Sequence, residues 1–186
     1  MHSLVLTKKW WLSPSLSTLL VKSLFGSALL ALLAQVSIPL QPVPITGQTL
    51  GVTLVGLGLG LRAGLGAVLL YLLEGAAGLP VFAGGGGSLA SFFGATGGYL
   101  WGFIPSVALL GWASDRGVLR SGTKTFGVAL LASALTFIPG LWQLSYFVPS
   151  DRLLDAGLIP FIPGGIIKAL VASAVLLPTY NFFKKI

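Results

Sequence analysis

Long apolar segments separated by short connections are the feature that most constrains the fold of this chain. Only 8% of its 186 residues are charged, whereas a soluble domain carries about 25%, so these charges cannot cover the apolar surface in water. A membrane-spanning helix needs roughly 20 residues. The sequence therefore predicts an all-α membrane protein whose six transmembrane helices form one bundle, at about residues 23–38, 47–61, 64–79, 97–114, 125–146 and 164–183. We expect one membrane-embedded domain over 1–186, with 1–22 as a cytoplasmic or interfacial N-terminal segment.

The basic residues predict the orientation of this bundle. They occupy every second connection and both termini, as Lys8, Lys9, Arg62, Arg116, Arg120, Lys124, Lys184 and Lys185. Because cytoplasmic loops carry the excess of Lys and Arg, both termini are expected in the cytoplasm, which fits a multi-pass protein of the cytoplasmic membrane with an even number of spans. The net charge of +7 is spread over these connections, whereas a nucleic-acid-binding protein gathers its basic residues on one face, so we expect no nucleic-acid partner.

Motifs for catalysis or for a cofactor are missing from the sequence. It contains no cysteine and a single histidine, His2, so we expect no metal site and no cofactor. The stretch GVLRSGTK at 117–124 fails the phosphate-loop pattern, because Thr123 separates Gly122 from Lys124. Any ATP hydrolysis is therefore expected from a partner, and the chain is not expected to be an enzyme.

Two ionisable residues lie inside apolar segments, and both are expected in the outer half of the membrane. A charge near the membrane centre costs about 2.5–3.5 kcal/mol on insertion scales. Lys168 follows Pro163, Gly164 and Gly165, so its ammonium and a helix N-terminus would hold an anionic group together. The alternative for Lys168 is snorkelling to the interface. Glu74 is expected either to pair with Lys168 or to face the outer headgroups.

Further polar and glycine-rich positions are expected at the same outer mouth. The run Gly84, Gly85, Gly86 and Gly87 is flanked by apolar residues, so it is predicted to fold back and let backbone approach a ligand. Side chains that offer hydrogen bonds there are Gln48, Thr49, Thr96 and Tyr99, with Tyr71 as a further candidate.

A stripe of small residues recurs every fourth position in the first apolar segment, at Ser23, Ser27 and Ala31. Small residues let membrane helices approach closely. The stripe is therefore predicted either to pack within the bundle or to form a docking face for another membrane protein.

The sequence resembles the BioY family, the biotin-binding S components of energy-coupling-factor (ECF) transporters. Four stretches carry the resemblance: IPLQPVPITGQTL at 38–50, VLLYLLEGAAGLPVFAGGGG at 68–87, GATGGYLWG at 94–102 and GLIPFIPGGIIK at 157–168. The resemblance implies six membrane helices and biotin binding near the outer surface. It also implies delivery of biotin inward with a transmembrane T component and two ABC-type ATPases. Some family members are proposed to function without this module, as oligomers.

The resemblance also assigns roles to residues of this chain. Lys168 matches the family's lysine, which would pair with the biotin carboxylate or its polar network, and the stripe of the first helix corresponds to the face that docks the T component. At Gly165 the family usually has an aspartate, and at position 74 leucine is commoner than glutamate. We therefore hypothesise that Glu74 partly replaces the missing carboxylate as partner of Lys168.

Two further functions stay open at this point. The same architecture would serve an S component for another small vitamin or heterocyclic carboxylate. A membrane-embedded enzyme or a scaffold subunit is the third possibility, although the chain has no nucleophile–base set for an enzyme, and a scaffold would leave Lys168 idle.

Overall fold

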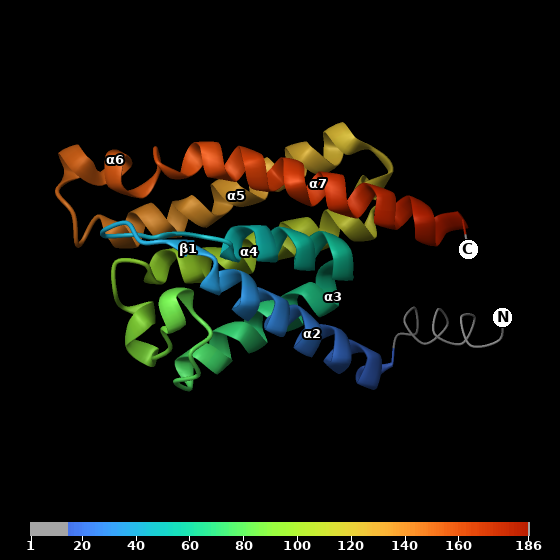
Figure 1. The fold of residues 1–186 in the computed structure, drawn as a ribbon, viewed down its shortest axis with the longest axis horizontal. Coiled ribbons are helices and arrows are strands. Elements are labelled where there is room, and N and C mark those ends of the chain that lie inside the picture. The colour runs from blue at the N-terminus through green and yellow to red at the C-terminus, as the bar shows by residue number, and fades with distance from the viewer. Residues whose placement is uncertain (1–14, 186) are drawn as a thin grey trace.

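Helices build nearly the whole molecule in the computed structural model, which describes residues 15–185 (Figure 1). Its long helices are α2 (Leu16–Gln35), α3 (Gln48–Ala76), α4 (Gly97–Asp115), α5 (Gly122–Leu144) and α7 (Phe161–Lys185). The connections hold the short helix α6 (Leu153–Gly157), an antiparallel pair of two-residue strands, β1 (Ser37–Ile38) and β2 (Ile45–Thr46), and the 3-10 turns η1 (Ala83–Gly85), η2 (Leu89–Phe92), η3 (Val118–Arg120) and η4 (Ser150–Arg152). The prediction of an all-α protein is confirmed in this respect.

The first helix begins earlier than the sequence predicted. α2 starts at Leu16 because Ser15 caps it: the Ser15 hydroxyl oxygen accepts a hydrogen bond from the Thr18 backbone N–H at 3.3 Å. A serine at this position satisfies a backbone donor that the helix leaves unpaired. The predicted N-terminal segment 1–22 is thus partly helical, and its basic pair Lys8 and Lys9 lies outside the described residues.

The second and third predicted segments form one helical stretch that turns back on itself. Within α3, Gly60 has φ 78° and ψ −178°, which is not helical. A Cβ added to Gly64 would lie 3.3 Å from the Cα of Gly56, whereas a straight helix would separate these positions by about 12 Å. The chain therefore reverses at Gly60, and the two halves of α3 lie against each other (Figure 1).

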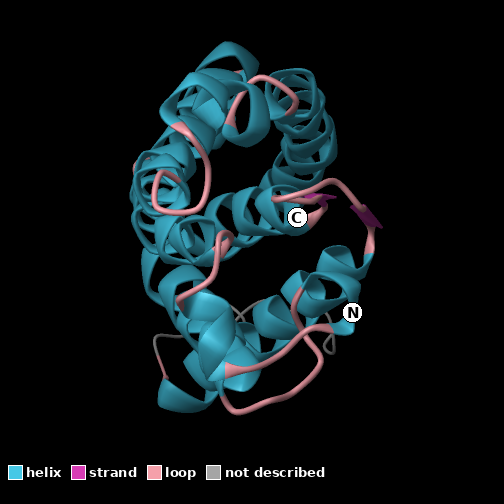
Figure 2. Ribbon diagram, turned by 90° about the vertical axis from the view of Figure 1, so that its left-hand side faces the viewer, coloured by secondary structure: helices cyan, strands magenta, loops and turns pink. Residues whose placement is uncertain are grey.

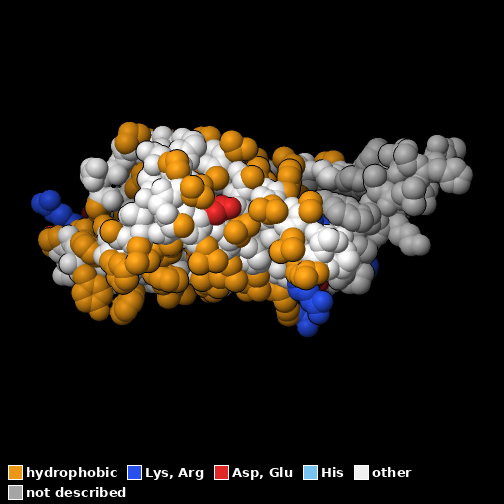
Figure 3. All heavy atoms as spheres, turned by 90° about the horizontal axis from the view of Figure 1, so that it is seen from below, with side chains coloured by type: hydrophobic (Ala, Val, Ile, Leu, Met, Phe, Trp, Pro, Cys, Tyr) orange, Lys and Arg blue, Asp and Glu red, His pale blue; other side chains and the backbone are white. Residues whose placement is uncertain are grey.

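Four stretches of the described chain are long and apolar enough to cross a membrane: Leu16–Gln35, Gln48–Ala76, Gly122–Leu144 and Ser150–Tyr180. The surface composition is consistent with a membrane location, because large apolar side chains such as Leu32, Ile138 and Leu170 are exposed. Figure 3 shows one face on which hydrophobic side chains predominate and basic side chains lie toward the ends. The molecule is therefore a helical membrane protein, while the count of six spans stays a prediction.

The two ends of the bundle differ in their residues. We call the end that holds the turn at Gly60, η3 and the first turn of α5 the basic end, since it carries Arg62, Arg116, Arg120 and Lys124. The start of α2 and the end of α7 lie at this end as well (Figure 1). The opposite end carries β1, β2, η1, η2 and α6, and we call it the pocket end; Figure 2 looks onto it.

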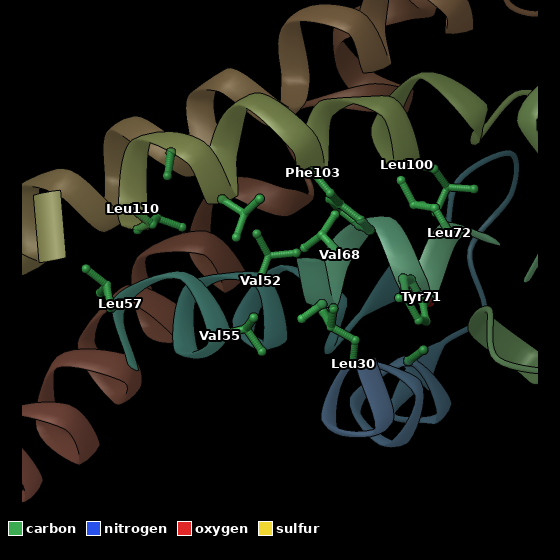
Figure 4. Close-up of a cluster of buried hydrophobic side chains, with 14 of the residues drawn as sticks. Leu30, Val52, Val55, Leu57, Val68, Tyr71, Leu72, Leu100, Phe103 and Leu110 are labelled. Atoms are coloured by element: carbon green, nitrogen blue, oxygen red, sulfur yellow. The ribbon is translucent and has the colours of Figure 1, made fainter. Parts of the chain in front are cut away.

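Close helix packing fills the bundle interior. Leu30, Val52, Val68 and Leu110 belong to one buried cluster that joins α2, α3 and α4 (Figure 4). Glycine permits the close approach of α3 to α4, because a Cβ added to Gly56 would lie 2.6 Å from the Cβ of Leu110. Small residues let membrane helices approach closely, and Gly56 has this role between α3 and α4.

The predicted docking face on α2 packs inside the bundle instead. Ser23 and Ser27 are buried at 7% and 1% exposure. The Ser23 hydroxyl donates to the Ala63 carbonyl oxygen at 3.4 Å, and Ala31 packs against the buried cluster. Of the two interpretations of this stripe, packing is the correct one in this structure, because the small side chains seat α2 against α3. The exposed face of α2 carries larger residues, among them Leu20 and Leu24.

Candidate binding site

A cavity of about 180 Å³ lies at the pocket end, where the β1–β2 connection and η1 meet α3, α4, α5 and α7. Its polar lining is Thr46, Gln48, Thr49, Ser91, Thr96, Ser133, Thr136 and Lys168. The remaining lining is Val43, Pro44, Phe82, Ala83, Gly86, Tyr99, Leu100, Phe103, Phe137, Phe161 and Gly165. Few polar groups among apolar and aromatic walls are typical of pockets for small molecules.

Lys168 brings an ammonium group into this cavity from α7. Its Nζ donates to the Thr46 carbonyl oxygen at 2.6 Å and to the Thr49 hydroxyl at 2.9 Å. An ammonium has three donors, and these two bonds leave one without a partner among the described residues. The half-buried side chain is thus held by the end of β2 and the start of α3, and it keeps one N–H for an acceptor in the cavity.

A chain of hydrogen bonds continues from Lys168 across the pocket. The Thr46 hydroxyl donates to Gln48 Oε1 at 2.9 Å, and Gln48 Nε2 donates to the Tyr71 hydroxyl at 2.6 Å. The Tyr71 hydroxyl in turn donates to the Val81 carbonyl oxygen at 3.1 Å. Because each member positions the next, this chain fixes the polar wall before a ligand arrives.

Three aromatic rings form the apolar wall. Tyr99, Phe137 and Phe161 come from α4, α5 and α7, and their ring centroids are 6.0–6.3 Å apart. The Tyr99 hydroxyl donates to the Gly157 carbonyl oxygen at 2.8 Å. Tyr99 therefore offers its ring to the cavity, while its hydroxyl ties α4 to the segment that precedes α7.

The glycine run folds over the pocket end, as predicted, but only one of its members lines the cavity. Gly86 does so, whereas Gly84 and Gly85 adopt positive φ angles of 67° and 75° in η1. A Cβ added to Gly87 would collide with the Leu79 carbonyl oxygen, so only glycine fits there. Gln35 of α2 holds this loop, because its Oε1 accepts from the Gly85 backbone N–H at 3.1 Å.

Most predicted site residues meet in the cavity. Those that line it are Gln48, Thr49, Gly86, Thr96, Tyr99, Gly165 and Lys168. Tyr71 is fully buried behind Gln48 and supports the site without lining it. Gly84, Gly85, Gly87 and Glu74 do not line the cavity.

Glu74 does not partner Lys168 in the part of the chain that the structure describes. Its carboxylate accepts a hydrogen bond from the Ser27 hydroxyl at 2.5 Å, between α2 and α3. The hypothesis that Glu74 replaces a missing partner of Lys168 is thus wrong in this geometry. The physical reason is rotational: Glu74 points toward α2, while the Lys168 ammonium points to the start of α3.

The sequence prediction missed the contribution of α5. Ser133, Thr136 and Phe137 line the cavity from this helix, which carries no family-like motif. The Thr136 hydroxyl lies 2.8 Å from that of Ser106 in α4. Polar residues three positions apart within an apolar helix share one face, so Ser133 and Thr136 were the signal that could have found this wall.

The arrangement can bind and orient a small molecule. Among residues 15–185 no cluster of His, Cys, Asp and Glu is arranged to hold a metal ion. The ammonium suits an anionic group, the hydroxyls suit polar ring substituents, and the aromatic rings suit an apolar ring. Fold and site together define a helical membrane protein with a small-molecule pocket.

The family follows from comparison with known proteins. The family model described as "BioY family" matches residues 7–185. The chain therefore belongs to the BioY family.

Its relatives are named for one ligand. The "Biotin transporter BioY2" of Lactococcus lactis subsp. cremoris is 36% identical, covering 80% of this chain and 82% of the relative. The "Biotin transporter BioY" of Thermotoga maritima is 36% identical, and the match covers 85% of this chain and 93% of the relative. The "Biotin transporter BioY" of Rhizobium etli is 39% identical, and the match covers 83% of this chain and 88% of the relative.

A solved structure shares the fold. The crystal structure of the S component for biotin from an ECF-type ABC transporter superposes with a TM-score of 0.79. The two sequences are 29% identical, and the superposition covers 89% of this chain and 92% of the chain in the crystal structure.

Proposed function

We propose that this chain takes up biotin across the cytoplasmic membrane as the S component of an ECF transporter. Its family membership and the biotin named for its relatives support this function. The single observation that carries the proposal is Lys168, which lines a cavity of about 180 Å³ and makes two hydrogen bonds to the described residues, one fewer than an ammonium can donate.

Each part of biotin has a counterpart in the cavity. The Lys168 ammonium would pair with the carboxylate, because hydrogen bonds between charged groups are roughly twice as strong as neutral ones. The wall of Tyr99, Phe137 and Phe161 would cover the apolar ring. Hydroxyls such as those of Thr96 and Ser133 would meet the polar ureido group.

We also propose six spans with both termini in the cytoplasm and the pocket facing outward. The reversal of α3 at Gly60 supports this topology, because it provides two crossings within one helical stretch. The start of α2 and the end of α7 share the basic end (Figure 1), which the positive-inside rule places in the cytoplasm.

Energy for transport is proposed to come from a transmembrane T component with two ABC-type ATPases, so this chain need not hydrolyse ATP. With Ser23, Ser27 and Ala31 packed inward, such a partner would meet the exposed residues of α2, including Leu20 and Leu24. The alternative is transport without the module, as a homo-oligomer.

Equilibrium binding of radiolabelled biotin to the purified full chain tests the proposal. We expect saturable binding that unlabelled biotin displaces and that thiamine and riboflavin do not. Biotin methyl ester, which lacks the anionic carboxylate, should compete more weakly than biotin. Displacement by another vitamin in preference to biotin would identify a different S component, and uptake by cells with and without a T component would separate the two modes of transport.

A further inference from the structure

A second concave region lies at the basic end, remote from the biotin pocket. It is a shallow, open groove of about 740 Å³ between the end of α4 and the start of α5. Its apolar lining includes Val118, Val128, Leu130 and Leu131. Gly127 forms part of its floor, and a Cβ added there would meet no atom within 4 Å. The groove is therefore left unfilled by residues 15–185.

Cationic side chains border this apolar groove. The Arg116 guanidinium lies 3.9 Å from the centroid of the Trp112 ring, which orients it at the rim, and Lys124 lines the groove from the first turn of α5. Arg120 is near, because a Cβ added to Gly117 would lie 3.1 Å from its Nε.

No carboxylate among residues 15–185 pairs with Arg116 or Lys124. The neighbouring acid, Asp115, is directed elsewhere, since its carboxylate accepts from the Leu61 backbone N–H at 3.2 Å. The groove thus combines an apolar floor with two cations that have no carboxylate partner among residues 15–185, and these cations lie at one end of helices with exposed apolar side chains.

We propose that this groove binds an anionic phospholipid, with the phosphate on Arg116 and Lys124 and an acyl chain along Leu130 and Leu131. Leu131 is 61% exposed and Trp112 49% exposed, so this wall faces the surroundings of the bundle, where an acyl chain lies. Basic pockets between membrane helices bind anionic headgroups in this way. A water-soluble acidic ligand would match the cations but not the apolar floor.

Retention of phosphatidylglycerol by the purified full chain, measured by native mass spectrometry, tests whether Arg116 and Lys124 bind the lipid phosphate. We expect the double variant Arg116→Gln/Lys124→Gln to weaken binding about 25-fold, because each cation near a membrane surface strengthens anionic lipid binding about fivefold. Arg62→Gln/Arg152→Gln removes the same charge from exposed positions outside the groove and should weaken binding less than about twofold. Equal loss in both double variants would overturn the site.

The apolar part has its own test. Gly127→Leu would place a side chain in the groove, at a position where an added Cβ meets no described atom within 4 Å, whereas Gly164→Leu adds the same side chain at another open helical glycine. Only the first is expected to release phosphatidylglycerol, while both keep the melting temperature in neutral detergent within a few degrees of the parent chain. Release by both variants, or by neither, would contradict the proposal.

A photoreactive leucine analogue in place of Leu130, which lines the groove without filling it, identifies the occupant in native membranes. A phospholipid adduct, absent when Arg116 and Lys124 are replaced, is the expected result. A protein adduct in place of the lipid would overturn it and assign the groove to a partner chain.

Discussion

The pocket that we propose for biotin and the groove at the basic end both place cations beside apolar residues, but they hold these cations to different degrees. Lys168 is half-buried and donates two hydrogen bonds to acceptors of its own chain. Lys124, in contrast, is exposed and has no partner among the described residues. A cation fixed before binding loses little freedom when a ligand arrives, which favours affinity and selectivity. An exposed, mobile cation tolerates many headgroups, which suits a lipid contact.

The two sites also differ in the contacts that position the cation. Lys168 is connected through Thr46 to a chain of hydrogen bonds that ends at Val81 in the loop over the pocket. Arg116 contacts a single aromatic ring, that of Trp112. The comparison predicts that changes in the pocket act over several elements, while changes in the groove stay local.

Removal of the pocket cation is the largest expected effect. Lys168→Ala should weaken biotin binding about 30-fold or more, because truncating one partner of a buried charge pair costs about 2–5 kcal/mol. The measurement is equilibrium binding of labelled biotin. Arg62→Gln, an exposed cation at the basic end, is the matched control and should bind as the parent chain does. If Lys168→Ala kept parental affinity, the pocket would not be the biotin site.

Loss of the Tyr71 hydroxyl should come next. Tyr71→Phe leaves the Gln48 amide and the Val81 carbonyl without their partner, and a buried unsatisfied group costs about 1–3 kcal/mol. We expect a lower melting temperature together with weaker biotin binding, since Gln48 lines the pocket. Tyr146→Phe makes the same chemical change at a ring that is 71% exposed and should alter neither quantity. A stability loss without any change in affinity would show that the hydrogen-bond chain does not reach the ligand.

Replacement of Glu74 should change the stability of the protein without changing its affinity for biotin. Glu74→Leu removes the acceptor of the Ser27 hydroxyl and should lower stability by about 1 kcal/mol. Biotin affinity should stay within about twofold of the parent, because Glu74 does not line the pocket. Glu74→Gln, which keeps an acceptor for Ser27, should restore the stability. A large loss of affinity in Glu74→Leu would revive the pairing with Lys168 that the geometry contradicts.

The sequence predicted the helices well because each is a long apolar run with polar or proline-rich ends. It also brought Gln48, Thr49, Tyr99 and Lys168 to one site, since family-like motifs and charge placement both mark the same end of the bundle. The reversal at Gly60 was predicted only as a boundary between two segments. Gly60 alone makes this reversal because it adopts a positive φ angle, and no pattern of apolar residues reveals such an angle.

What the sequence could not give was helix rotation. Ser27 and Glu74 face each other because α2 and α3 meet at one particular rotation, and a pattern of small residues fits either an inner or an outer face. The hydrophobic residues themselves do not separate these faces, because lipid is as apolar as the core. For the same reason the pocket wall on α5 was hidden in an apolar segment, and only its polar members Ser133 and Thr136 marked it.

The smallest predicted effect concerns two adjacent glycines of α7 that differ only in what they face. A Cβ added to Gly164 or to Gly165 meets no atom within 4 Å, but Gly165 lines the pocket and Gly164 does not. Alanine is favoured over glycine inside a helix by about 0.5–1 kcal/mol, so both Gly164→Ala and Gly165→Ala should raise the melting temperature slightly.

Only Gly165→Ala should also change biotin affinity, by a few-fold, because its methyl group narrows the cavity one turn before Lys168. Thermal unfolding and biotin titration of the two variants side by side measure both quantities. An equal change of affinity in the two variants would mean that α7 acts on the pocket through its helical stability, whereas a change confined to Gly165→Ala would place the ligand against this turn of α7.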